Sequence, residues 1–324
     1  MTLPRNLIWM GDRVEILDQR HLPGAVRYLS CSRWPHVAQA IADLSVRGAP
    51  AIGIAAAYGM ALAVIEGGVA PDQGSVGLVR ARPTAVEPAV TVPRVQAAAL
   101  AGGAAAAVAE ALRIHDEDAA RCARMASLGA ALLVGQGWVL THCHTGAMAT
   151  GGVGTALGAI RRACEADPAC GVYGCETRPL WQGARLTAWE CQQLGLPYAL
   201  LTDGAAAFLM AQGRVGAVCV GADRIAANGD VANKIGTLSL ALAAAHYGVP
   251  FYVVASMTTV DAGLDSGAQI PIEERQADEV RLPQAPEGTP VWNPAFDVTP
   301  GTLVSGIVTE VGVFRRPYGF IPGS

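Results

Sequence analysis

From about residue 137 onward, short apolar runs alternate with longer segments of helical pattern. The runs begin at Trp138, Gly171, Tyr198, Ala217 and Phe251. Helical pattern lies between them, at about 152–165, 182–194, 204–212 and 233–247. Strand, helix, strand at this spacing is typical of a parallel sheet with helices on both faces. We therefore predict an α/β fold whose C-terminal domain, residues 135–324, is Rossmann-like.

The N-terminal part, residues 1–134, predicts a smaller, mainly helical domain that starts with a β-hairpin. Two short runs flank Gly11-Asp12, as strands flank a turn. We expect helices over 35–44, 50–66 and 95–133, and a Gly- and Pro-rich loop over 67–93. The last helix is expected to break near Gly102-Gly103 or at the acidic residues 116–118.

Residues 48–65 carry no charge and are long enough to cross a membrane. They are mostly Ala and Gly with few large apolar side chains, so a helix buried inside the protein fits better than a membrane span. The first residues include Arg5, Trp9 and Asp12 rather than a long apolar leader, which favours a cytoplasmic protein. The net charge of -4 supplies no basic field for nucleic acid.

The cysteines form no C-x-x-C pair, and a chain of 324 residues needs no disulfide staples, so we expect a reducing compartment. The run His142-Cys143-His144 raises the question of a metal. Adjacent strand residues point to opposite faces, and no second Cys/His cluster completes a coordination shell, so no metal is expected.

Polar residues follow the predicted strands at the edge where such sheets bind ligands. They include Cys143, Arg178 and Asp223. The Gly-rich segment 146–158 follows the first strand and opens a helix, which suits an anion. It contains neither a clean G-x-G-x-x-G nor a P-loop, so a small phosphoester fits better than a nucleotide.

Two of these residues suit acid–base chemistry. A thiol near a helix start, as in Cys143, can have a lowered pKa and act as base or nucleophile; the alternative is a buried structural cysteine. The carboxyl of Asp223 ends an apolar strand, and partial desolvation would raise its pKa and make it a proton donor. A salt bridge to Arg224 or a turn cap is equally compatible with the sequence.

Further residues suit a phosphate or a sugar hydroxyl. Arg47-Gly48-Ala49 puts a cation and free N–H groups at a helix start, and Arg82 is a second cation. Gln182 is placed to bind a hydroxyl. Lys234 is the only lysine beside 22 arginines, which indicates a position where a compact ammonium is needed.

Taken together, the motifs resemble one family over nearly the whole chain. Methylthioribose-1-phosphate isomerases carry the same motifs in the same order: Arg47-Gly-Ala-Pro, Arg82-Pro-Thr, Thr141-His-Cys, Glu176-Thr-Arg-Pro, Gln182-Gly-Ala-Arg, Gly221-Ala-Asp and Asn233-Lys-Ile-Gly. That family shares its fold with the regulatory subunits of the translation-initiation nucleotide-exchange factor.

The resemblance implies a homodimeric aldose–ketose isomerase of methionine salvage, which converts 5-methylthioribose 1-phosphate to 5-methylthioribulose 1-phosphate without a cofactor. By motif position, Cys143 and Asp223 would be catalytic. The substrate-binding residues would be Arg47, Gly48, Ala49, Arg82, Gln182, Asn233 and Lys234.

Three positions depart from the family pattern: His144 and Glu87 stand where Asn is usual, and Cys175 where Asp is common. They leave the identity of the sugar open, so a relative acting on 5-deoxyribose 1-phosphate or ribose 1,5-bisphosphate is an alternative. A non-catalytic regulatory subunit on the same fold is another.

Overall fold

A computed structural model describes residues 3–67, 71–82, 86–281 and 285–320. Contacts between residues divide the chain into two compact units. The first unit comprises Met1–Ala123 and Gly146–Gly154, and the second comprises Arg124–Thr145 and Thr155–Ser324. The Gly-rich segment after the first strand of the second unit therefore packs with the first.

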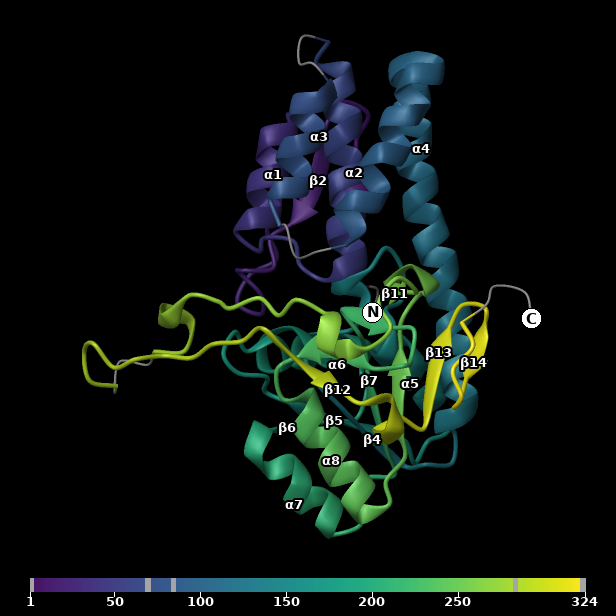
Figure 1. The fold of residues 1–324 in the computed structure, drawn as a ribbon. Helices are drawn as coiled ribbons and strands as arrows, with labels where there is room; N and C mark the ends of the chain where they lie inside the picture. The colour runs from purple at the N-terminus through teal and green to yellow at the C-terminus, as the bar shows by residue number, and fades with distance from the viewer. Residues whose placement is uncertain (1–2, 68–70, 83–85, 282–284, 321–324) are drawn as a thin grey trace. The chain divides into compact units, whose positions relative to one another are not determined.

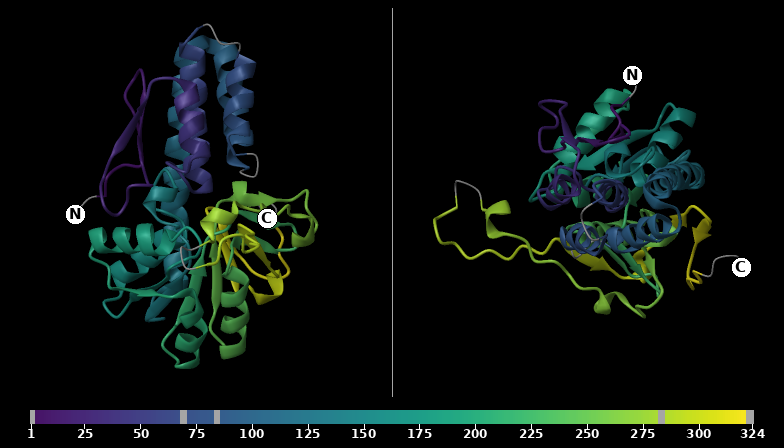
Figure 2. Two further views of the ribbon diagram at one scale, coloured as in Figure 1. Left: turned by 90° about the vertical axis from the view of Figure 1, so that its left-hand side faces the viewer. Right: turned by 90° about the horizontal axis from the view of Figure 1, so that it is seen from above.

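The first unit begins with a three-stranded antiparallel sheet. Strands β1 (Leu7–Trp9) and β2 (Val14–Leu17) form the predicted hairpin, and β3 (Tyr28–Cys31) adds a strand that the pattern did not predict. Helices α1 (Trp34–Ala42), α2 (Ala49–Ile65) and α3 (Pro71–Arg80) pack on one another beside it (Figures 1 and 2). Most of α2 is buried, as predicted for a helix inside the protein.

Helix α3 occupies the stretch predicted to be a loop, so that prediction is wrong. Its glycines are packing positions rather than loop formers. A methyl group on Gly77 would lie 2.4 Å from the ring of Trp34, and one on Gly74 would lie 2.8 Å from Ala63. Leu78 of the same helix is fully buried. Close helix packing thus explains the glycine content.

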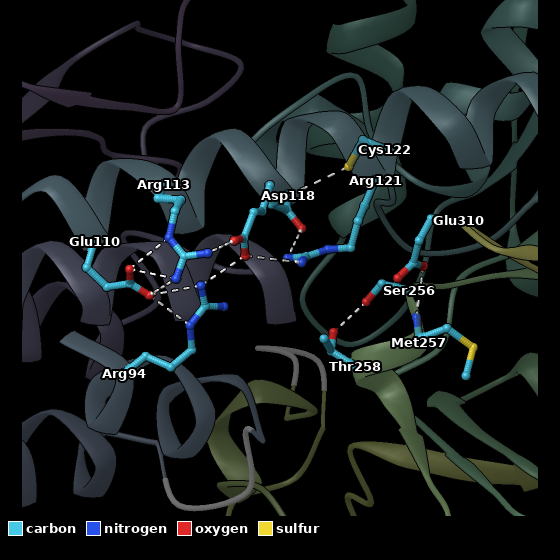
Figure 3. Close-up of polar contacts among 11 residues, drawn as sticks. Arg94, Glu110, Arg113, Asp118, Arg121, Cys122, Ser256, Met257, Thr258 and Glu310 are labelled. Carbon is cyan, nitrogen blue, oxygen red and sulfur yellow. Dashed lines mark hydrogen bonds and ion pairs between the residues drawn. The ribbon is translucent and has the colours of Figure 1, made fainter. Parts of the chain in front are cut away.

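Helix α4 (Glu87–Leu133) is interrupted by non-helical backbone at Gly102 and Gly103, one of the two predicted break sites. Arg94, before the break, donates a hydrogen bond of 3.0 Å to Glu110, after it (Figure 3). It donates another of 3.0 Å to Glu117. By length and composition alone, α4 passes for a membrane-spanning helix. The break and the ion pairs weaken that interpretation.

The second unit is built on a seven-stranded sheet in the order β14-β13-β10-β7-β4-β5-β6. All neighbouring pairs are parallel except β13–β14, which confirms the predicted Rossmann-like class. The strands are β4 (Trp138–Thr141), β5 (Gly171–Cys175), β6 (Tyr198–Leu201), β7 (Ala217–Val220), β10 (Phe251–Val254), β13 (Gly306–Thr309) and β14 (Gly312–Phe314).

Helices cover both faces of this sheet. Besides the end of α4, this unit contains α5 (Ala156–Ala166), α6 (Ala188–Leu194), α7 (Ala206–Ala211) and α8 (Thr237–Tyr247), and a π-helix, η2 (Gly183–Thr187), leads into α6. Val218 and Val220 pack in one cluster with residues of α7 and α8. Cys219 lies between them in sequence and faces Ala156 of α5. Successive side chains of β7 therefore point to opposite faces of the sheet, one covered by α7 and α8 and the other by α5.

A smaller sheet, in the order β11-β8-β9-β12, was not predicted. Its strands are β8 (Arg224–Ala226), β9 (Val231–Lys234), β11 (Val260–Asp261) and β12 (Phe296–Thr299). Asn233 and Lys234 thus lie on a strand, whereas the pattern placed them at a helix start. The chain between β11 and β12 makes a long excursion away from the sheets (Figures 1 and 2, yellow-green).

Cys164 of α5 and Cys170, just before β5, form a disulfide with an S–S distance of 2.08 Å. The expectation of a chain without disulfides is therefore wrong for this pair. The short segment that joins α5 to β5 brings the two Cα atoms to 4.8 Å, within the range that a disulfide requires. The remaining cysteines are free and buried.

Candidate active site

Cys143 and Asp223 leave neighbouring strands at the same edge of the large sheet. Cys143 follows β4 and Asp223 follows β7, and these strands pair in parallel with Leu140 opposite Val218. Adjacent strands lie about 4.8 Å apart. Both residues are thus at the carboxyl edge, where open α/β sheets bind ligands.

Cys143 has an unusual backbone conformation, and both its N–H and its carbonyl group are hydrogen-bonded to side chains. Its φ is +62°, in the left-handed region that non-glycine residues seldom adopt. Its N–H donates to Thr177 Oγ1 at 2.8 Å, and its carbonyl oxygen accepts from Thr187 Oγ1 at 2.7 Å. Such strained conformations cluster at functional sites, and they persist only where the surroundings enforce them.

Asp223 is connected directly to the strand that carries Asn233 and Lys234. Its N–H donates to the carbonyl oxygen of Ala232 at 2.9 Å. The adjacent Arg224 lies 3.6 Å from a carboxylate oxygen of Asp261. The hairpin of β8 and β9 therefore gathers three of the candidate residues in one place.

Lys234 is buried and held in one orientation. Its Nζ donates to the carbonyl oxygen of Ala295 at 2.8 Å and lies 4.6 Å from the ring centre of Phe296. Next to it, the Asn233 amide donates to Thr237 Oγ1 at 2.9 Å. Asp297 pairs with Asn233 across β9 and β12, and burial raises the pKa of the Asp297 carboxyl. These contacts hold the positively charged ammonium group of Lys234 in a defined position.

Gln182 directly precedes the π-helix η2 and is 5% exposed. Its Oε1 is buried without a hydrogen-bond partner among the residues that the structure describes. An unsatisfied buried acceptor is unusual and fits a group that receives a hydrogen bond from a ligand. π-helical turns are also frequent at functional sites.

The remaining predicted binding residues belong to the first unit. Arg47 and Gly48 precede α2, and Ala49 is its first residue. Gly48 has φ +95°, and a Cβ there would lie 2.5 Å from the carbonyl oxygen of Ala149, so only glycine fits. Arg82 follows α3, and the Pro83 and Thr84 of its motif lie outside the described residues.

Several residues around Cys143 were not predicted as site residues: Thr177, Thr187, His144 and Glu190. Thr177 appeared in the sequence only as the middle residue of the motif Glu-Thr-Arg, and no role was predicted for it. Nothing in the sequence marks Thr187, because its contact with Cys143 arises from the course of the π-helix. His144 had been noted only as part of the run His142-Cys143-His144 and as a departure from the family pattern.

His142, Cys175 and Asp203 have potential ligand atoms within 4.8 Å of one another. His142 Nε2 donates to the carbonyl oxygen of Ile235 at 2.8 Å, and burial lowers the pKa of the ring. Burial also raises the pKa of the Cys175 thiol, so the sulfur keeps its proton. The Asp203 oxygens accept from the N–H groups of residues 177 and 178. His142 Nε2 and both Asp203 oxygens thus already have hydrogen-bond partners within the protein.

Comparison with known proteins places the chain in a family. Residues 45–316 match the model of the initiation factor 2 subunit family, and the chain belongs to that family. Within it, the chain groups with methylthioribose-1-phosphate isomerases. The enzyme of that name from Anaeromyxobacter sp. (strain K) is 54% identical over 314 residues, which cover 95% of this chain and 92% of that protein.

Solved structures agree. The 5-methylthioribose 1-phosphate isomerase from Pyrococcus horikoshii OT3 superposes with a TM-score of 0.90 at 40% identity, over 98% of this chain and 94% of that one. The translation initiation factor eIF-2B subunit delta from A. fulgidus has a TM-score of 0.86 at 39% identity, over 98% and 97%. The predicted family and fold class are thus confirmed.

Proposed function

We propose that this chain is an enzyme that converts 5-methylthioribose 1-phosphate to 5-methylthioribulose 1-phosphate in methionine salvage. The observation that carries the proposal is the 54% identity, over 95% of the chain, to an isomerase of that name. Cys143, whose backbone is held in a left-handed conformation, and Asp223 add support, because they supply a thiol and a carboxyl at one edge of the sheet. Ligands of such sheets bind at that edge.

Cys143 and Asp223 have complementary roles in the proposed reaction. A phosphate on the anomeric oxygen blocks spontaneous ring opening, so Asp223 donates a proton to the ring oxygen. A hydrogen must then move from C2 to C1. In one route the Cys143 thiolate removes the C2 proton and returns it to C1 through an enediol-like intermediate; in the other, the hydrogen moves directly as hydride. In both routes the C2 hydroxyl passes its proton to the Asp223 carboxylate as the C2 ketone forms. Turnover in D₂O separates them, because only the first route exchanges the migrating hydrogen with solvent.

We also propose binding roles for the remaining residues. The free N–H groups at the start of α2 and the charge of Arg47 suit the phosphate, and Arg82 suits it as a second cation. Gln182 offers its buried, unsatisfied Oε1 to a sugar hydroxyl, and Asn233 and Lys234 approach from β9. The 5-substituent is tested by comparing turnover of 5-methylthioribose 1-phosphate, 5-deoxyribose 1-phosphate and ribose 1,5-bisphosphate.

The decisive experiment is incubation with 5-methylthioribose 1-phosphate and detection of the ketose. Cys143→Ala and Asp223→Asn should each lose activity by at least about a thousandfold while the proteins stay folded. Cys219→Ala, at a buried cysteine of β7, and Asp261→Asn are the matched controls and should keep activity. A parent protein that turns over none of the three sugars would favour the second candidate, a regulatory subunit like the A. fulgidus protein.

We further propose a homodimer, supported by the excursion between β11 and β12. This segment folds back on itself, with Arg275 N–H donating to the carbonyl oxygen of Asn293 at 2.8 Å. It carries Trp292 with 79% of its surface exposed. A large aromatic side chain in that position suits burial by a second copy. Light scattering should give twice the mass of one chain, and Trp292→Glu should reduce it to a single chain.

The homologous enzymes act in small-molecule metabolism, and we propose that this protein acts in the cytoplasm. The Cys164–Cys170 disulfide offers a check. Mass spectrometry of protein alkylated at the moment of cell lysis should find both thiols reduced if the compartment is reducing.

A further inference from the structure

The orientation of Cys143 depends on two threonine hydroxyls from different segments. Thr177, after β5, accepts from the Cys143 N–H at 2.8 Å, and Thr187, at the end of the π-helix, donates to the Cys143 carbonyl at 2.7 Å. Both threonines are at most 1% exposed. Because φ of Cys143 is +62°, the residue would relax toward a commoner conformation without these bonds, and its sulfur would point elsewhere.

The hydrogen-bond pattern defines where the protons lie. Thr187 has one hydroxyl proton, and the Cys143 carbonyl can only accept, so that proton lies between them. Thr187 Oγ1 must therefore accept from His144 Nδ1, which lies 3.0 Å away, and Nδ1 must carry a proton. On the other side of the ring, His144 Nε2 lies 3.3 Å from Glu190 Oε2. A continuous series of contacts thus leads from Glu190 through His144 and Thr187 to Cys143.

All of this series is buried. The side chains of His144 and Glu190 are 0% and 2% exposed. Water therefore does not compete for the bonds, and low solvent access strengthens each of them. Since His144 directly follows Cys143, an imidazole whose Nδ1 is bonded to Thr187 also restrains the peptide that joins the two residues.

We propose that Thr187 and His144 are positioning residues for the Cys143 thiol, a proposal that rests on the function proposed above. Thr187 fixes the Cys143 carbonyl, and His144 aims the Thr187 hydroxyl by donating to its oxygen. In this role neither side chain touches the substrate. Loss of either bond should therefore slow the chemical step and leave substrate binding nearly unchanged.

Four variants separate these contacts. Thr187→Val keeps the shape and removes the hydroxyl, whereas Thr187→Ser keeps the hydroxyl. His144→Leu removes both ring nitrogens, whereas His144→Asn keeps a donor, Nδ2, near the place of Nδ1 and gives up the Glu190 contact. We expect kcat to fall at least about tenfold in Thr187→Val and His144→Leu with KM within about twofold, and to stay within about threefold in the other two.

A matched control is available in Thr299, which is 0% exposed and whose Oγ1 has no hydrogen-bond partner among the described residues. Thr299→Val makes the same chemical change and should leave kcat unaltered. Parent-like kcat in both Thr187→Val and His144→Leu would overturn the proposal. If Thr187→Val fails to fold, the comparison of His144→Leu with His144→Asn decides on the same criterion.

A second readout does not require turnover. The rate at which iodoacetamide alkylates Cys143, followed by mass spectrometry of its peptide, should change at least about fivefold in Thr187→Val and His144→Leu and remain near the parent value in Thr187→Ser and Thr299→Val. If the parent does not isomerise any sugar but these rates differ as stated, the proposed function is wrong and the positioning role stands. If the parent is active and the rates and kcat do not differ, the positioning role is wrong.

Discussion

Gly183 lies directly against the carbonyl oxygen of Cys175: a methyl group on Gly183 would sit 1.7 Å from that oxygen. The contact joins the end of β5 to the first residue of the π-helix η2. That helix follows Gln182 and ends at Thr187. The close contact between the backbones of Gly183 and Cys175 therefore fixes the π-helix, and with it the positions of Gln182 and Thr187 at its two ends.

Gly183→Ala should displace the π-helix, because a separation of 1.7 Å is far below van der Waals contact and the obstacle is backbone. We expect a loss of about 2–3 kcal/mol in the free energy of unfolding and at least about tenfold in kcat. Urea denaturation and steady-state kinetics measure the two effects. Gly204→Ala is the control, since a methyl group there meets nothing within 4 Å. Equal stability and activity in both variants would contradict the contact.

Lys234→Arg should weaken substrate binding although it preserves the charge. Lys234 is 9% exposed, and its ammonium is bonded to the Ala295 carbonyl and close to the Phe296 ring. The longer planar guanidinium cannot take the same place. We expect KM to rise about tenfold, which is about 1.4 kcal/mol of binding. Arg214→Lys, a change in the opposite sense beside Tyr173, is the control and should leave KM unchanged. An unaltered KM for Lys234→Arg would remove Lys234 from the substrate site.

Five of the seven strands of the large sheet were predictable from sequence because they are short apolar runs, most of them buried, whereas β13 and β14 were not predicted. Trp138–Thr141, Tyr198–Leu201 and Ala217–Val220 begin where the pattern placed them. The strand Val231–Lys234 was not predictable, because it pairs with Phe296–Thr299, far along the chain. A local sequence pattern does not indicate such a distant pairing. Helix α3 was missed for a related reason: Gly77 serves a contact with Trp34 that only the fold creates.

The candidate site, like the fold, was predictable only in part. Cys143 and Asp223 could be placed because each directly follows an apolar strand, and a parallel sheet brings such positions to one edge. The role of Thr187 could not be inferred, since a helical segment of ordinary spacing would direct that residue differently from the π-helix that the structure contains. Sequence pattern thus locates the candidate residues, whereas the geometry that orients them comes from tertiary structure.

Gly103→Ala should destabilise the first unit. Gly103 has φ +69° and ψ -158°, a combination that is essentially restricted to glycine, and it allows the chain of α4 to change direction. We expect a loss of about 1–3 kcal/mol in the free energy of unfolding, measured by urea denaturation. Gly24→Ala is the control, because its methyl group would make an ordinary contact of 3.5 Å at a residue without positive φ. If Gly103→Ala is as stable as the parent, α4 does not need its break.

Asp230 should make stability depend on pH in the acid range. Burial alone would raise the pKa of its carboxyl, but the N–H groups of Gly301 and Gly267 and the Asn228 amide donate to it and hold the pKa below its usual value. A lowered pKa in the folded state means that the ionised form stabilises the fold. This contribution is complete above the unfolded-state pKa of about 4 and is lost as the pH falls through the lower, folded-state value.

Asp230→Asn should therefore cost about 1–2 kcal/mol of unfolding free energy at pH 7, because the amide accepts fewer and weaker bonds than the carboxylate. The difference from the parent should shrink as the pH is lowered below about 4, where the parent carboxyl becomes protonated too. Urea denaturation at a series of pH values measures both effects. Asp278→Asn, whose side chain is 90% exposed, is the control and should follow the parent at every pH. A difference between Asp230→Asn and the parent that persists unchanged at low pH would show that the carboxylate charge is not what holds these loops together.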